Sequence, residues 1–463
     1  MAKTPLPSAS EKLSILFVPL HGSAFLEMLP VAEQVRRDGR YGVSVFLEKW
    51  DTPALAEKGF MLLGPSGIRR MPPVTRTTAS EDATEGKPKR QTLKQRLWRL
   101  LPETVHEYIL LRSRLRRCRA LLRQCPAAAI VTSGDRHIGW ETGFIRAGHE
   151  RGIPCLVLPS GHSNPQSLVQ QRLAHPAWKK LYGIRRPFHR FLAGLFPQWA
   201  YAYGNRRVLY LTGGRLLAAK LLGMVPPNPW VLGGSMADRV AAESEREAAA
   251  FREQGCPPEK IAITGRPSAD MLNTAMQPSM EEMMREEMHI PAGKKFLLCA
   301  VPQLGEHGLL PWDEHWQEME WLFATLAGVP DVAIVLSLHP KSDPARYRAL
   351  AERHGLILAT RRLAELLPWC SAFCATFSST LSMAMALGKP CAVLGFYRLI
   401  YNMHGEVPGM DVVSDKSLLP ETLRKAVETP PAPPSERSRW ALLDGHCTER
   451  VVQALYDLIS HPA

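Results

Sequence analysis

Short apolar runs alternate with stretches of helical spacing along most of this chain, which is the pattern of a doubly wound α/β sheet. In the first half we predict strands over 13–19, 41–48, 128–132, 155–158 and 260–264, with helices over 24–37, 141–151 and 241–254. In the second half we predict strands over 295–301, 332–338, 356–359, 371–376 and 391–394, with helices over about 313–327, 363–369 and 449–459.

The βαβ rhythm is interrupted over about 164–230, which we interpret as an insertion, and again at a Met- and Glu-rich connection over 279–289. With 463 residues the chain is long for a single core, so two domains are expected. We predict an N-terminal Rossmann-like acceptor domain over 1–290 that carries the insertion, a C-terminal Rossmann-like nucleotide-sugar domain over 291–445, and a C-terminal helix over 446–463.

Two motifs in the second half each place polar residues where a strand ends. Val335 to Pro340 (VLSLHP) ends in a His-Pro pair, and Thr376 to Thr380 (TFSST) leads into a helical segment that reaches Gly388-Lys389-Pro390. In open parallel sheets, ligands bind at the carboxyl ends of the strands. A helix that opens with Ser-Ser-Thr offers backbone N–H groups to an anion, so these motifs predict a phosphate cradle.

Charge is unevenly distributed along the chain. The net charge is +13, and no acidic residue occurs between Glu150 and Asp238, where arginines and lysines are interleaved with aromatic residues. A second basic block, over 87–123, has leucines at helical spacing. This composition suits an anionic membrane surface or a polyanionic acceptor, although a solvated helix face is the simpler reading. No motif supports nucleic-acid binding, so we predict none.

The spacing of cysteines and the length of apolar runs indicate the compartment and the relation to the membrane. The nine cysteines are scattered without a Cys-x-x-Cys pair, which indicates reduced thiols in a cytoplasmic protein. We find no apolar run of about 18 residues and no signal peptide, so we expect a protein that is peripheral at the inner membrane.

The order of motifs resembles that of GT-B enzymes. Lys260 to Pro267 (KIAITGRP) with Asp270 is similar to a stretch of UDP-N-acetylglucosamine 2-epimerases and related glycosyltransferases. The His-Pro motif, the Ser-Ser-Thr loop and Gly388-Lys389-Pro390 resemble bacterial capsular polysaccharide synthesis proteins, which include Kdo transferases, polysialyltransferases and CDP-glycerol glycerophosphotransferases. This resemblance implies an α/β GT-B fold, with two Rossmann-like domains facing a central cleft.

One departure from the epimerase pattern bears on the donor. Ser382 and Met383 stand where epimerases have an acidic pair that holds the ribose. This difference argues against an epimerase, and it makes a pyrimidine nucleotide (CMP, CDP or UDP) a safer expectation than any single one. The chain has no Asp-x-Asp triplet, and GT-B enzymes generally work without a metal, so neither a metal nor a cofactor is expected.

Glycosyl transfer requires stabilisation of the leaving phosphate and removal of a proton from the acceptor hydroxyl. For the donor side we predict His339, Pro340, Ser378, Ser379, Thr380, Arg266, Gln303 and His307. For the base we predict Asp135 and His21 first, since both follow apolar strands directly, and then His162 and Glu141. A helix cap, a structural histidine or a loop hydrogen bond is the simpler reading of each.

The sequence therefore favours a glycosyltransferase that moves a sugar from a nucleotide-activated donor to a surface glycan or a lipid-linked acceptor. A sugar-nucleotide 2-epimerase or hydrolase remains an alternative, as does a non-catalytic assembly protein on the same scaffold.

Overall fold

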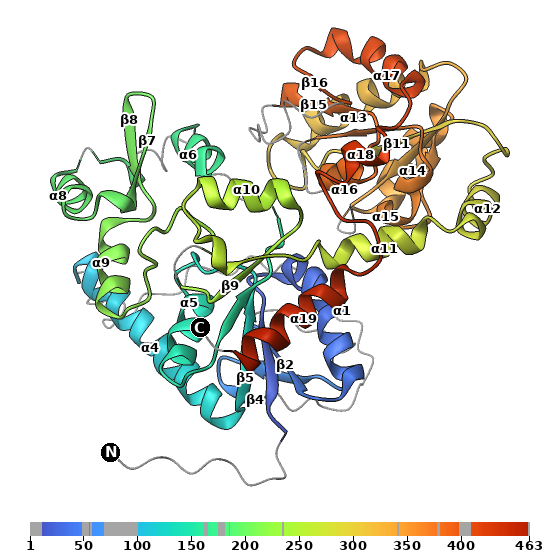
Figure 1. The fold of residues 1–463 in the computed structure, drawn as a ribbon. Coiled ribbons are helices and arrows are strands. Elements are labelled where there is room, and N and C mark those ends of the chain that lie inside the picture. The colour runs from blue at the N-terminus through green and yellow to red at the C-terminus, as the bar shows by residue number, and fades with distance from the viewer. Residues whose placement is uncertain are drawn as a thin grey trace, which may run out of the picture. The chain divides into compact units, whose positions relative to one another are not determined.

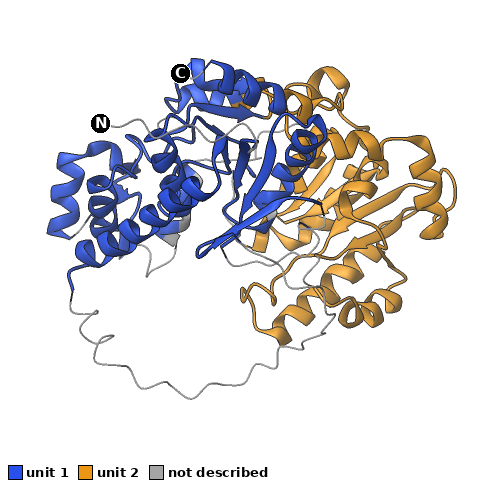
Figure 2. Cartoon of the chain, turned by 90° about the horizontal axis from the view of Figure 1, so that it is seen from below, with its two compact units in different colours: residues 1–242, 248–262, 451–463 blue, residues 243–247, 263–450 orange. Residues whose placement is uncertain are grey.

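The computed structural model describes residues 12–48, 55, 58–68, 101–161, 165–174, 181–184, 186–233, 236–339, 342–376, 380–397 and 409–461. Contacts divide the chain into two compact units (Figure 2). Unit 1 comprises residues 1–242, 248–262 and 451–463, and unit 2 comprises 243–247 and 263–450. Residues 263–290 thus group with unit 2, whereas the boundary suggested by the sequence is at 290.

Unit 1 is built on a sheet that has eight strands in its described part, in the order β10-β9-β6-β5-β1-β2-β3-β4 (Figure 1). The strands are β1 (Ser14–Val18), β2 (Gly42–Phe46), β3 (Met61–Gly64), β4 (Gly67–Ile68), β5 (Ala127–Thr132), β6 (Cys155–Val157), β9 (Arg239–Ala242) and β10 (Ile261–Ile263). The pairs β1–β2, β1–β5, β2–β3, β5–β6 and β6–β9 are parallel, and β3–β4 is antiparallel. The chain runs outward from β1 to β4 and then from β5 to β10 on the other side, so the switch point lies between β1 and β5.

The helices of unit 1 complete its core. They are α1 (Gly22–Asp38), α4 (Glu103–Gln124), α5 (Trp140–His149), α6 (Pro165–Ala174), α8 (Pro187–Leu195), α9 (Gly213–Leu221) and α10 (Glu245–Glu253), the last of which begins in unit 2. Helix α4 buries Leu111, Leu115 and Leu122 at helical spacing, as predicted for the basic block. The predicted helix over 241–254 is wrong in its first residues, because Arg239–Ala242 form the buried strand β9 beside β6.

The insertion is a small subdomain of helices and a hairpin. Helices α6, α8 and α9 accompany an antiparallel hairpin of β7 (Ala200–Tyr203) and β8 (Arg206–Leu209), preceded by a 3-10 turn at Pro197–Trp199. Trp199 is fully buried, and its ring stacks on Phe196 with the ring centroids 4.0 Å apart. Its backbone carbonyl accepts a hydrogen bond from Trp230 Nε1. This bond links the last residue of the insertion to Trp199 near its centre.

Unit 2 has a six-stranded parallel sheet in its described part, in the order β13-β12-β11-β14-β15-β16. The strands are β11 (Phe296–Ala300), β12 (Ala333–Ser337), β13 (Ile357–Leu358), β14 (Ala372–Ala375), β15 (Cys391–Leu394) and β16 (Met410–Val413). The switch point lies between β11 and β14, and five of these strands were predicted from the apolar runs.

The helices of unit 2 are α11 (Pro267–Ala275), α12 (Pro278–Glu287), α13 (Trp312–Ala327), α14 (Pro344–Arg353), α15 (Leu363–Leu366), α16 (Thr380–Ala386), α17 (Leu419–Glu428) and α18 (Pro434–Arg437). Short 3-10 turns lie at Pro258–Lys260 in unit 1 and, in unit 2, at Leu367–Trp369, Gly395–Tyr397 and Lys416–Leu418. The stretch over 279–289 predicted as a connection is the helix α12.

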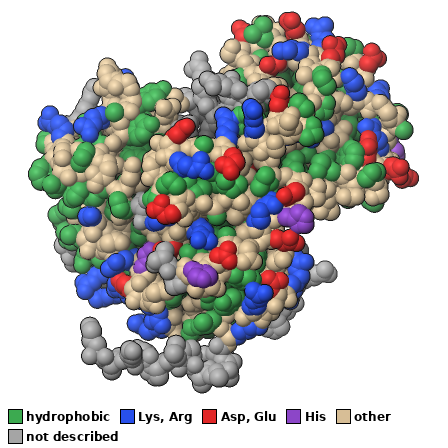
Figure 3. Space-filling view, viewed as in Figure 1, with side chains coloured by type: hydrophobic (Ala, Val, Ile, Leu, Met, Phe, Trp, Pro, Cys, Tyr) green, Lys and Arg blue, Asp and Glu red, His purple; other side chains and the backbone are tan. Residues whose placement is uncertain are grey.

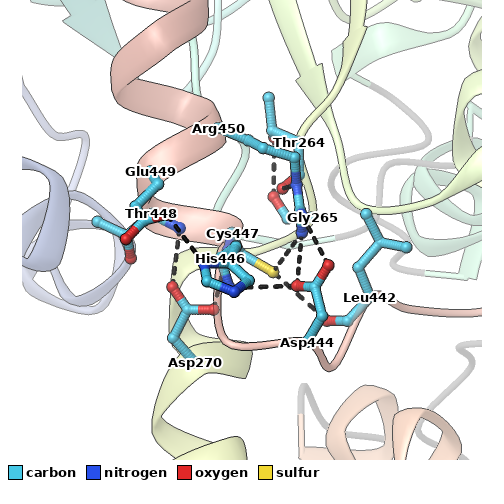
Figure 4. Close-up of polar contacts among 10 residues, drawn as sticks. All are labelled: Thr264, Gly265, Asp270, Leu442, Asp444, His446, Cys447, Thr448, Glu449 and Arg450. Atoms are coloured by element: carbon cyan, nitrogen blue, oxygen red, sulfur yellow. Dashed lines mark hydrogen bonds and ion pairs between the residues drawn. The ribbon is translucent and has the colours of Figure 1, made fainter.

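The last helix, α19 (Cys447–Ser460), begins in unit 2 and continues into unit 1. Its first turn is capped by Asp270 of α11, whose two carboxylate oxygens accept the N–H groups of Cys447 (3.0 Å) and Thr448 (2.8 Å) (Figure 4). Arg450 donates from Nε to the Thr264 carbonyl at 2.8 Å. Further along, α19 contributes Val451, Leu455 and Leu458 to the core that α1 and the sheet of unit 1 form.

Candidate functional site

The switch point of unit 1 gathers polar side chains from the loops that follow β1 and β5. His21 comes three residues after β1, and Ser133 to His137 follow β5 directly. The backbone N–H of Leu20 donates to Ser133 Oγ at 3.0 Å, which joins the two loops. The predicted residues His21, Asp135 and Glu141 therefore belong to one edge of the sheet, while His162 lies outside the described residues.

Asp135 is fully buried, and its carboxylate accepts hydrogen bonds from backbone N–H groups that lie far away in the sequence. The N–H of Gly233 donates to Oδ1 at 3.0 Å, and the N–H groups of Met236 and Ala237 donate to Oδ2 at 3.4 Å each. A carboxylate that is occupied by three backbone donors and closed to solvent is suited to holding the segment before β9. Its predicted role as a base gains no support from this geometry.

His21 is the N-cap of α1 and is exposed. Its Nδ1 accepts the backbone N–H of Ala24 at 3.1 Å, in extended backbone conformation. Capping by Nδ1 requires a lone pair on that nitrogen, so protonation of Nδ1 would break the cap. The structure thus confirms that His21 caps a helix, and its role as a base stays a prediction.

Glu141 differs from the other candidates because its buried carboxyl group is hydrogen-bonded to the hydroxyl of Ser133 at the edge of the sheet. Its side chain is 2% exposed, and Oε1 accepts Ser133 Oγ at 2.6 Å and Ser133 N at 3.0 Å. Burial raises the pKa of Glu141 to about 8, against the hydrogen bonds from Ser133 and Gly134. A carboxyl group with a pKa near neutrality can take up or release a proton under working conditions.

His137 lies in the same loop and was not predicted from the sequence. Desolvation, and then the charges of Arg215 and Arg114, lower the pKa of His137, while Glu48, two residues beyond β2, raises it. The ring therefore favours its neutral form, which can accept a proton. The Asp135-Arg136-His137 sequence was the available signal, since the loop after a central strand is a preferred place for such groups.

At the switch point of unit 2, the loop after β11 carries Gln303, Glu306 and His307. Gln303 is half-buried, and within the described part of the chain its Nε2 is closed to solvent and has no hydrogen-bond partner. His307 is exposed. An unsatisfied buried amide N–H is a donor that a ligand oxygen can satisfy.

A hydrogen-bond network holds this loop in place. Glu306 Oε1 accepts Ser342 Oγ and Tyr347 Oη, each at 2.7 Å, and His315 Nε2 lies 3.1 Å from Tyr347 Oη. His315 Nδ1 accepts the N–H of Gly305 at 3.2 Å. Burial alone would raise the pKa of Glu306, but the bonds from Tyr347 and Ser342 outweigh it and the pKa is lowered, so the carboxylate is charged.

The remaining predicted donor residues lie around the same sheet edge. His339 is exposed two residues after β12, and Thr380 is the first residue of α16, which follows β14. Pro340, Ser378 and Ser379 fall outside the described residues, so the cradle they were predicted to form stays a prediction.

Arg266, also predicted on the donor side, is a buried residue that pairs with Glu243. The distance from Nη2 to Glu243 Oε2 is 2.9 Å, and both side chains are at most 10% exposed. This pair joins the two chain segments that make up unit 2, 243–247 and 263–450. The geometry accounts for Arg266 structurally and leaves its proposed contact with the donor as a prediction.

The described residues contain no group of three or more His, Cys, Asp or Glu that could hold a metal ion. None of the described helices is both long and apolar enough to cross a membrane.

Neither a protein-family model nor a curated protein sequence matches the chain. Solved structures do match over nearly the full length. S. aureus MnaA, in a structure with UDP, gives a TM-score of 0.52 at 11% identity, covering 97% of this chain and 99% of that one. The UDP-GlcNAc 2-epimerase from Neisseria meningitidis bound to UDP-GlcNAc gives 0.51 at 13%, covering 96% and 100%.

The calicheamicin glycosyltransferase CalG4 matches as well, with a TM-score of 0.52 at 15% identity, covering 98% of this chain and 99% of that one. At these identities the likeness shows the fold alone. The chain has the α/β GT-B fold, with one Rossmann-like sheet in each unit. The predicted fold class is therefore confirmed.

Proposed function

We propose that the protein is a metal-independent glycosyltransferase that moves a sugar from a pyrimidine nucleotide donor (CMP-, CDP- or UDP-linked) to a surface glycan or a lipid-linked acceptor. The observation that carries the proposal is the Ser133–Glu141 pair at the switch point of a GT-B unit, where the carboxyl group has a pKa of about 8. Structural neighbours with the same fold are named as a glycosyltransferase and as a protein with bound UDP.

In this proposal unit 1 binds the acceptor. Ser133 is half-buried and Glu141 is closed to solvent. When Glu141 is ionised, the acceptor hydroxyl gives its proton to Ser133 Oγ as Ser133 passes its own proton to Glu141 Oε1, 2.6 Å away, so transfer should speed up as pH rises toward about 8. The oxygen of the acceptor then attacks the anomeric carbon while the bond to the donor phosphate breaks.

Unit 2 binds the donor. The start of α16 at Thr380, with Ser378 and Ser379 before it, offers N–H groups and hydroxyls to the phosphates. His339 adds a donor for the leaving phosphate, and the loop of Gln303 and His307 lies at the same edge of the sheet. The charge that develops on the leaving group is stabilised by these donors in place of a metal.

A binding screen tests the donor half. The full chain is melted in the presence of CMP, CDP, UDP, GDP and their sugar conjugates, since a ligand at 100 times its Kd stabilises a fold by about 2.7 kcal/mol. A shift with one pyrimidine nucleotide is expected. Absence of a shift with every nucleotide would refute donor binding by the free protein.

Glu141→Gln tests the chemical half, because glutamine keeps the acceptor of the Ser133 bond and cannot take the proton. Transfer or slow hydrolysis of the donor should fall by about 100-fold or more while donor affinity is unchanged. Glu253→Gln, at an exposed position of α10, is the matched control. Full activity in Glu141→Gln would remove Glu141 from the mechanism.

A sugar-nucleotide 2-epimerase is the second candidate, because structures of UDP-GlcNAc 2-epimerases share the fold. Nuclear magnetic resonance of UDP-GlcNAc incubated with the protein distinguishes the two. Appearance of the 2-epimer without any acceptor would replace the transferase proposal, whereas release of the nucleotide that depends on an added acceptor supports it.

The same proposal places the protein at the cytoplasmic face of the inner membrane through the insertion. Helix α8 buries His189, Leu192 and Ala193 on one face and exposes Phe188 (43%), Phe191 (65%) and Leu195 (58%) on the other. Figure 3 shows green and blue side chains among tan atoms in the part where α8 and the β7–β8 hairpin lie. An apolar stripe in an acid-free, arginine-rich region suits an anionic bilayer surface.

Vesicle sedimentation tests this surface. The protein should bind vesicles rich in phosphatidylglycerol at low salt, and Phe191→Ser should weaken binding by about fivefold to tenfold. Leu418→Ser, which changes a 50% exposed leucine of unit 2, is the matched control. Equal sedimentation of all three proteins would refute this role of α8, and no sedimentation at all would refute membrane binding.

A further inference from the structure

Arg172 of α6 is a buried cation that forms no ion pair with a carboxylate among the described residues. Its side chain is 7% exposed. Its Nη1 donates to the carbonyl of Leu209 at 3.2 Å. A guanidinium group has five N–H donors, so this bond accounts for a small part of its capacity.

Three aromatic rings surround this guanidinium group. The Cζ atom of Arg172 lies 4.7 Å from the ring centroid of Tyr182, 5.1 Å from that of Tyr210 and 5.2 Å from that of Trp230. Cation–π contacts stabilise the charge and hold the plane of the group without using its N–H donors. The cage therefore fixes the direction of the donors and leaves them available.

A second arginine, in the loop after β5, also contacts Trp230. Arg136 Nη1 donates to the Trp230 carbonyl at 3.0 Å, and its charge contributes to lowering the pKa of Arg172, after the larger effect of burial. Two like charges near one tryptophan repel each other, and folding tolerates such a pair most readily when an anion neutralises it.

The nearby carboxylates do not serve as that anion. Asp135 and Glu141 both act on the Tyr210 phenol electrostatically, which places them in the neighbourhood. The Asp135 oxygens accept the backbone N–H groups described above, and Glu141 is engaged with Ser133. The stretch from 151 to 237 that supplies Arg172 and its three rings contains no acidic residue.

We propose that Arg136 and Arg172 form an oxyanion-binding subsite in unit 1, which takes a phosphate or carboxylate group of the acceptor. Arg136 follows Asp135 in the loop that begins with Ser133, so a bound anion would lie beside the Ser133–Glu141 pair. Guanidinium groups bind both oxyanions with paired N–H bonds. Only the naming of the acceptor as source rests on the proposed function, since anion binding itself does not require transfer.

The test is a thermal-shift titration of the full chain with inorganic phosphate, and separately with glucuronate, at constant ionic strength. A saturating nucleotide found in the donor screen blocks phosphate binding in unit 2. The wild type should be stabilised by one of the two anions, and the anion that acts identifies the source as a phosphorylated or an acidic-sugar acceptor.

Arg136→Gln and Arg172→Gln should each weaken anion binding by about tenfold or more, as expected for loss of a charge-assisted hydrogen bond. Arg207→Gln, at an exposed position of β8 with the same change in charge, is the matched control. Arg136 is only partly buried, so its variant keeps the test decisive if Arg172→Gln does not fold.

The proposal is overturned if neither anion stabilises the wild type, or if Arg136→Gln binds the anion as the wild type does. Equal weakening in Arg207→Gln would mean general electrostatic attraction, which also overturns it. Each of these failures leaves nucleotide binding and the activity of the Glu141 pair untouched, so it can be told apart from a failure of the proposed function.

Discussion

Glu141→Gln should change how the stability of unit 1 depends on pH, because the carboxyl group is held protonated by burial. In the unfolded chain the group loses its proton near its ordinary pKa of 4.5, whereas in the folded chain it keeps the proton to about pH 8. Between these values the folded state binds more protons than the unfolded state, so stability is fully present below the lower pKa and falls as pH rises.

The magnitude follows from the size of the shift. At about 1.36 kcal/mol per pH unit, the displacement from 4.5 to about 8 amounts to about 5 kcal/mol across the whole window. Two pH units within the window correspond to about 2.7 kcal/mol, or about 5 to 10 °C in the Tm of a unit of this size. Glutamine keeps the side-chain oxygen that accepts the Ser133 bonds and does not titrate.

The assay is thermal unfolding of wild type, Glu141→Gln and Glu253→Gln from about pH 5 to about pH 8. The Tm of Glu141→Gln should rise relative to wild type as pH increases, and Glu253→Gln should follow the wild type. A difference between Glu141→Gln and wild type that stays constant with pH would refute the reasoning, since the burial of Glu141 would then not control its proton.

Three further substitutions test the packing and the donor loop. Asp270→Ala removes the cap of α19 and should cost about 1–2 kcal/mol in denaturant unfolding, whereas Asp270→Asn, which keeps one of the two accepting oxygens, should restore part of it; equal losses would contradict a capping role. Gly265→Ala should cost about 2–3 kcal/mol, because Gly265 has φ +76° and a Cβ would lie 2.4 Å from Cys447 Sγ; an unchanged Tm would refute this clash. Tyr347→Phe removes a 2.7 Å bond to Glu306, should cost about 1–2 kcal/mol and should weaken nucleotide binding in calorimetry; unchanged affinity would separate this network from the donor site.

Apolar patterning predicted most of the strands, because strands buried on both faces are continuous apolar runs. Residues 333–337 and 391–394 are such runs, and the structure has β12 and β15 there. The short strand β9 was missed because Ala241 and Ala242 favour helix on intrinsic propensity, and pairing of β9 with the neighbouring strands β6 and β10 overrides that preference.

The site was less accessible from sequence because its decisive contacts join distant residues. Asp135 looked like a base at a strand end, and only the structure shows its oxygens taken up by residues 233–237. Glu141 was ranked below Asp135 and His21 by position, and its raised pKa depends on burial that no local pattern reveals. The link between Glu306 and Tyr347 spans 41 residues and has no sequence signature.

The path of α19 has a consequence for synthesis of the protein. Val451, Leu455 and Leu458 complete a core whose other members include Phe17, Met28 and residues as early as 15, yet residues 263–450 are made in between. Domains usually fold in the order in which they leave the ribosome. In this protein all residues of unit 2 are synthesised before unit 1 is complete. The core of unit 1 stays incomplete until residues 451–460 emerge from the ribosome, so unit 1 is the part that we expect a chaperone to bind.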